Sequence, residues 1–160
     1  MPKDYFNDPI EKETGQSFKA SPQALMFERL VSELQATLEE EVFFDDSDWP
    51  HGFDWSNEAD AVWEGLAEDA TLLAKFRTRN PADQVLCRAA GLIYRAICAG
   101  SPIELEAVCR QFAEIMKLPV PAHAHFLLEE AQNCLQQMGD RAETDDHKRS
   151  GADQGPALEA

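Results

Sequence analysis

Carboxylates, aromatic rings and a histidine are concentrated in residues 45–55, which read DDSDWPHGFDW. Aspartate and histidine side chains bind divalent cations, and an EF-hand loop places oxygen ligands at positions 1, 3 and 5, glycine at 6 and glutamate at 12. Counted from Asp46, position 3 is Asp48, but position 5 is Pro50 and position 12 is Asn57. The stretch therefore does not match an EF-hand.

A second group of metal-ligating residues is the pair His123 and His125, where a helix is predicted to begin. Residues two apart on a helix project about 200° from each other, so this pair is poorly arranged to hold one ion. A looser site that combines His51, His123 or His125 with nearby acids stays open. It is the basis of one alternative function, a small metal-dependent enzyme.

The cysteines lack the CxxC spacing of a zinc site, and we interpret all four as small thiols buried in the core: Cys87, Cys98, Cys109 and Cys134. The sequence contains no glycine-rich phosphate loop, no GxSxG and no HExxH motif. Because no motif defines an active site, we predict a protein that is not an enzyme and has no cofactor.

The charge distribution is the strongest feature of the sequence. The formal net charge is −16 at pH 7, and residues 30–74 contain thirteen of the thirty acids and no lysine or arginine. We call residues 30–74 the acidic block. Such a charge repels nucleic acid and membrane surfaces and attracts basic surfaces. We therefore expect a basic protein surface as the partner, one belonging to a nucleic-acid-binding or secreted protein for example, and no direct binding of nucleic acid or membrane.

The acidic block also holds all three tryptophans and three phenylalanines of the chain. Two interpretations stay open: a solvated acidic face whose connecting loop folds its rings back onto the protein, or aromatic anchors within a charged rim, as in binding hot spots. Asp60, Glu64 and Glu68 stand four residues apart and form one acidic line on a predicted helix. The candidate partner-binding residues are Asp45, Asp46, Asp48, Trp49, Phe53, Asp54, Trp55, Glu58, Asp60, Glu64 and Glu68.

Helical periodicity dominates the chain, and strand-type alternation is nearly absent. Apolar stripes and capping signals predict helices over residues 22–43, 57–78, 81–99, from Pro102 to before Pro119, and 122–138. Helix 81–99 is apolar around most of its circumference, which is typical of the central helix of a bundle. The fold class is therefore all-α, a compact bundle of about five helices with a disordered acidic C-terminal tail.

The expected domain organisation is a flexible N-terminal arm (1–20), a helical domain (21–139) and a disordered tail (140–160) with almost no apolar content. The first residues lack the apolar segment of a signal peptide, and no apolar run is long enough to cross a membrane. We therefore predict a cytoplasmic protein.

The leading hypothesis for function is a non-enzymatic acidic protein that binds a basic surface of a partner as a regulator, inhibitor or acidic chaperone. One alternative is a DNA mimic that inhibits a nucleic-acid-binding protein, such as a restriction or CRISPR component, because carboxylates can take the place of phosphates. The metal-dependent enzyme is the other alternative.

Overall fold

The computed structural model of the chain describes residues 20–46 and 55–159, and the side chains of residues 20–42 and 59–144. No strand occurs in these ranges, so the predicted all-α fold is confirmed. They form five helices: α2 (Pro22–Asp46), α3 (Trp55–Ala74), α4 (Pro81–Ile97), α5 (Pro102–Met116) and α6 (Ala122–Glu159).

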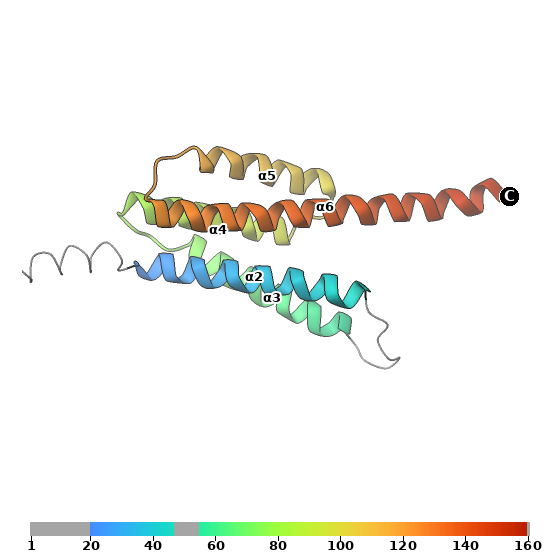
Figure 1. The fold of residues 1–160 in the computed structure, drawn as a ribbon, viewed down its shortest axis with the longest axis horizontal. Coiled ribbons are helices and arrows are strands. Elements are labelled where there is room, and N and C mark those ends of the chain that lie inside the picture. The colour runs from blue at the N-terminus through green and yellow to red at the C-terminus, as the bar shows by residue number, and fades with distance from the viewer. Residues whose placement is uncertain (1–19, 47–54, 160) are drawn as a thin grey trace, which may run out of the picture.

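The helices form three layers, with α2 and α3 on one side, α5 on the opposite side, and α4 and α6 between them (Figure 1). Helix α4 contacts all four other helices, whereas α3 contacts only α2 and α4, and α5 contacts only α4 and α6. The prediction that residues 81–99 supply the central helix is therefore confirmed. Helix α3 keeps one side uncovered by any other described helix.

The core is built from the predicted apolar stripes. On α2 the whole stripe is buried: Phe27, Leu30, Val31, Leu34 and Leu38. Burying a side chain of this size contributes about 1.5–3 kcal/mol, so helix α2 is held mainly by packing. The predicted stripes of α4, α5 and α6 are buried in the same way, except that their last members are half-buried: Ile97, Met116 and Met138. On α3, Leu66, Ala70 and Leu73 of the predicted stripe are buried, but Val62, which the same periodicity predicts to be buried, is 43% exposed.

Side-chain caps fix the helix starts. The Ser101 hydroxyl accepts a hydrogen bond from the backbone N–H of Glu104 at 3.2 Å, and the Glu104 carboxylate accepts one from Gly100 N–H at 2.8 Å. The Asn80 side chain accepts from the first N–H groups of α4. Asp83 stands where a capping-box acid would stand but does not accept the Asn80 N–H, which donates to the Thr78 hydroxyl at 3.2 Å.

The buried Asp83 carboxylate instead accepts a hydrogen bond from the Ser21 hydroxyl at 2.6 Å. Ser21 also caps α2, because its oxygen accepts from Ala24 N–H at 3.0 Å. The start of α2 is thus tied to the start of α4 through one hydroxyl. A buried carboxylate requires such a donor, which explains why Asp83 turns toward Ser21 and away from its own helix.

The predicted bounds of the second helix, 57–78, are wrong at both ends. Helix α3 ends at Ala74 and not at residue 78, because Lys75, Phe76 and Arg77 are all exposed and another turn would bury nothing. It also begins at Trp55, two residues before the predicted start, so Ser56 and Asn57, two residue types that often cap helices, lie inside its first turn.

The predicted end of the last helix at Gly139 is also wrong, since α6 continues to Glu159 and projects beyond the other helices (Figure 1). One glycine costs a helix only about 1 kcal/mol. Met138 and Ala142 pack against the core on either side of Gly139, which favours continuation. The predicted disorder of residues 140–160 stays a prediction, since side chains from residue 145 on lie outside the described part.

Candidate functional site

The stretch of residues 45–55 connects two helices, as the sequence predicts. Asp45 and Asp46 belong to the last turn of α2, while Trp55 and Glu58 belong to the first turns of α3. The side chains of these four residues lie outside the described part of the chain. The candidate residues Asp48, Trp49, Phe53 and Asp54 lie entirely outside it, as does His51.

The three remaining candidate residues form the predicted acidic line on the surface. Asp60, Glu64 and Glu68 are all exposed on α3. They stand four residues apart, so each is about 6 Å from the next along the helix axis. The structure therefore brings these three carboxylates onto one outer face.

Beside this acidic line lies a groove of about 480 Å³ between α3 and α4. Glu64 and Glu68 line the groove, whereas Asp60 lies one turn further toward the start of α3. The other walls include Leu72, which is 57% exposed, and Tyr94, which is 39% exposed. We call this depression the α3–α4 groove. It places two carboxylates next to exposed apolar and aromatic surface.

Sequence reasoning missed the apolar part of the groove. Leu72 directly precedes Leu73, which belongs to the buried stripe of α3, so Leu72 lies on a different side of the helix. Its exposure could therefore have been predicted from the sequence. Tyr94 and Cys98 stand four residues apart on the outer side of α4, and both line the groove. Their periodicity differs little from that of the buried residues of α4, so the sequence gives no comparable signal for them.

The interpretation of all four cysteines as buried core thiols is wrong for Cys98. Cys87 and Cys134 are buried and Cys109 is half-buried, but Cys98 is exposed because it forms the C-cap of α4. The neighbouring Cys98 side chain, chiefly by hydrogen bonding to the Tyr94 hydroxyl, raises the pKa of Tyr94.

One acid of the block has a structural role. The Glu41 carboxylate accepts a hydrogen bond from the Trp63 indole N–H at 2.5 Å. Its other oxygen lies 3.6 Å from the Arg141 guanidinium, and the Glu41 side chain is only 21% exposed. Glu41 therefore connects α2, α3 and α6, and it keeps the half-buried Trp63 ring oriented. Its carboxylate serves the fold, unlike those of the acidic line.

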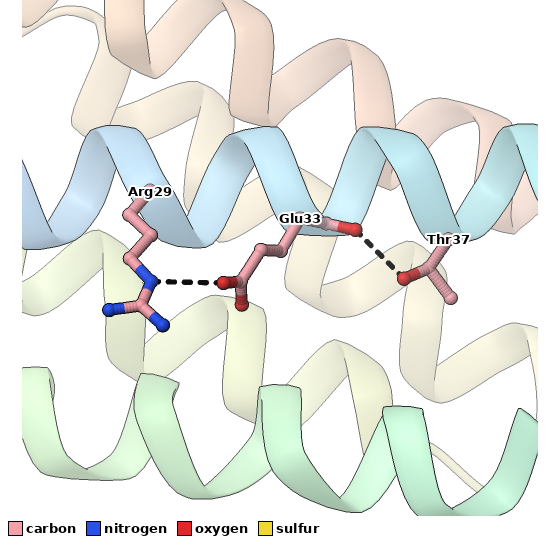
Figure 2. Close-up of polar contacts among 3 residues, drawn as sticks. All are labelled: Arg29, Glu33 and Thr37. Atoms are coloured by element: carbon pink, nitrogen blue, oxygen red, sulfur yellow. Dashed lines mark hydrogen bonds and ion pairs between the residues drawn. The ribbon is translucent and has the colours of Figure 1, made fainter. Parts of the chain in front are cut away.

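Arg29, just before the acidic block, lies against two further acids. Its Nε donates to a Glu33 carboxylate oxygen at 3.0 Å on the side of α2 next to α3, and Thr37 donates to the Glu33 backbone carbonyl (Figure 2). The hydrogen bond with Glu33, and then the charges of Glu33 and Asp69, raise the pKa of Arg29. The charges of Glu33 and Asp69 are thus partly neutralised by Arg29.

The histidine pair does not converge on a common point. His125 Nδ1 lies 3.1 Å from a Glu129 carboxylate oxygen, one turn along α6, and His123 is exposed. Among the residues whose side chains are described, no group of three or more histidine, cysteine or acidic side chains could hold a metal ion.

No helix within the described ranges is both long and apolar enough to cross a membrane. Comparison with protein-family models, with curated proteins and with solved structures finds no match to this chain.

Proposed function

We propose that the protein is a non-enzymatic interaction protein whose α3 face binds a basic surface of a partner protein, as a regulator, inhibitor or acidic chaperone acting in the cytoplasm. The observation that carries the proposal is the position of Glu64 and Glu68, which are exposed and line the α3–α4 groove with Leu72 and Tyr94. Exposed aromatic and aliphatic groups supply binding energy, and the acidic rim supplies attraction and orientation.

The charge of the acidic block supports the same proposal. Glu33, Glu41 and Asp69 lie near arginines, whereas none of the ion pairs among the described side chains involves Asp60, Glu64 or Glu68. The next basic residue after them in the sequence is Lys75. An uncompensated face of this kind accelerates the encounter with a basic partner and makes binding depend on salt.

The test is affinity capture from the native host, performed at low and at high salt. The wild-type protein should retain a basic partner at low salt and release it at high salt. The variant D60K/E64K/E68K should lose that partner. The matched control E28K/E106K/E143K changes the net charge equally, through exposed acids on α2, α5 and α6, and should retain it. Equal loss in both variants would contradict a local binding face.

The DNA-mimic alternative rests on the acidic line. Its carboxylates form a closely spaced, regular row of negative charge, and a row of phosphates along a DNA strand has the same general character. The same capture distinguishes it from the leading proposal. A DNA mimic requires that a short DNA duplex displace the captured partner at low salt, whereas a regulator that binds elsewhere on its partner should be unaffected by DNA.

A further inference from the structure

We infer that the α3–α4 groove binds one amphipathic helix of the partner, with basic residues at one end of its contact face and an apolar anchor one to two turns away. This inference rests on the proposed function and specifies what the partner presents. It follows from the shape of the groove, the position of its charges and the spacing along α3.

The shape favours a helix. Two adjacent packed helices leave a groove between their side-chain ridges, and a third helix fills such a groove well. The protein already contains one example, because α5 lies along α4 and α6 and buries Leu105, Val108, Phe112 and Ile115. The α3–α4 groove has no such cover among the described helices. Lining residues run from Glu64 to Lys75, roughly 16 Å or three helical turns.

The charges select the occupant. Glu64 and Glu68 line the end of the groove nearer the start of α3, and Lys75 lines the opposite end. A second copy of this chain is disfavoured, since each copy carries a net charge of −16. A helix with lysine or arginine residues at the acidic end, and none beside Lys75, matches the electrostatic asymmetry.

The spacing gives the sequence pattern of the occupant. Glu64, Glu68 and Leu72 stand at successive turns of α3, and Tyr94 faces the same groove from α4. A docked helix that runs alongside α3 has the same rise per turn. Its two basic residues should therefore stand four apart, with a leucine or phenylalanine about four residues further, placed against Leu72 and Tyr94.

Cys98 supplies a reporter inside the groove. It is exposed and lines the groove, whereas Cys87 and Cys134 are buried and burial raises the pKa of both thiols. Thiol reagents react with the thiolate, so alkylation should begin at Cys98. An occupied groove should slow this reaction.

The experiment uses a synthetic peptide of about 18 residues, long enough to form a helix, with lysines at two positions four apart and leucine four further on. It is made in both sequence orders, since a helix can dock in either direction. We expect binding by fluorescence anisotropy, slower alkylation of Cys98, and about fivefold weaker binding to Leu72→Ala. The matched control is Leu25→Ala, the same change at a position 55% exposed on α2, which should bind normally.

A double-mutant cycle tests direct contact. When the peptide leucine is replaced by alanine, Leu72→Ala should cause little further loss, because the two side chains would contact each other. Additive losses, or unchanged Cys98 alkylation at saturating peptide in both sequence orders, would overturn the inference. If neither of the two peptides binds, the inference is overturned as well.

This inference and the proposed function can fail separately. If the captured partner is lost by D60K/E64K/E68K but bound normally by Leu72→Ala, the acidic face binds the partner and the helix-in-groove inference is wrong. If the partner is retained by both variants, the proposed function is wrong too.

Discussion

Replacing Glu41 by alanine should lower the free energy of unfolding by about 2 kcal/mol, although Glu41 belongs to a block of thirteen acids whose mutual repulsion opposes folding. The reason is local. The Glu41 carboxylate accepts a hydrogen bond from the Trp63 indole N–H at 2.5 Å and lies 3.6 Å from the Arg141 guanidinium. It therefore contacts side chains of two other helices, α3 and α6.

The magnitude follows from these two contacts. A hydrogen bond to a charged group contributes about 1.5–3 kcal/mol, and the lower part of this range applies because water reaches the 21% exposed Glu41 side chain. The ion pair with the 30% exposed Arg141 adds less than about 1 kcal/mol. The sum corresponds to a fall of roughly 4–8 °C in Tm for a chain of this length.

Urea unfolding followed by far-UV circular dichroism measures this difference. The neighbouring Glu40→Ala is the matched control, because Glu40 is exposed, and its effect should stay within about 0.5 kcal/mol. In a double-mutant cycle, Glu41→Ala and Trp63→Phe should show a coupling of about 1 kcal/mol or more. Equal effects of the Glu40 and Glu41 substitutions, or additive effects in the cycle, would refute the structural role of Glu41.

Three further predictions concern other parts of the fold. Ser21→Ala should cost about 2–3 kcal/mol in chemical denaturation, because it removes the cap of α2 and the hydrogen-bond donor to the buried Asp83. Gly139→Ala should raise stability by about 0.5–1 kcal/mol in thermal unfolding, because α6 continues through this position and nothing lies within 4 Å of an added Cβ. Burial, and then the charges of Glu130 and Glu39, raise the pKa of the Cys134 thiol from 9.0 to about 11. As the pH rises between these two values, the unfolded chain loses the thiol proton while the folded protein keeps it. The free energy of unfolding should therefore fall by about 1.4 kcal/mol per pH unit across that interval. Cys134→Ala should reduce this slope in urea titrations at several pH values.

Each of these predictions has its own contrary outcome. Ser101→Ala removes a cap with no buried acid attached and should cost only about 1 kcal/mol. An equal cost for Ser21 and Ser101 would show that the contact with Asp83 contributes nothing. A loss of stability in Gly139→Ala, with a gain in the mid-helix control Gly65→Ala, would indicate that α6 ends near residue 139. If the slope of the free energy of unfolding against pH is the same in Cys134→Ala, the loss of stability at alkaline pH comes from other groups.

The sequence predicts the helices well because burial and periodicity coincide in them. The stripe on α2 is buried at every position, and the helix predicted to begin at Pro102 does begin there, with Ser101 as its N-cap. The boundary errors occur where a local signal is weak against packing. Gly139 resembles a C-cap, but contacts of Met138 and Ala142 with the core favour continuation of α6.

The candidate site is predictable only in part. Exposure of the line Asp60, Glu64 and Glu68 follows from helical spacing. The groove does not, because it depends on how α3 packs against α4 and on which side of α4 presents Tyr94. Likewise, nothing in the sequence distinguishes Glu41, with its bond to Trp63, from the exposed acids beside it.

Whether the α3 face is the binding surface is decided by the affinity of the purified partner for two charge-reversed proteins, measured by isothermal titration calorimetry at low and high salt. We expect D60K/E64K/E68K to weaken binding at least about tenfold more than E28K/E106K/E143K, with a difference that shrinks as salt is added. Equal affinities of the two variants at low salt would contradict the claim that the α3 face is the binding surface.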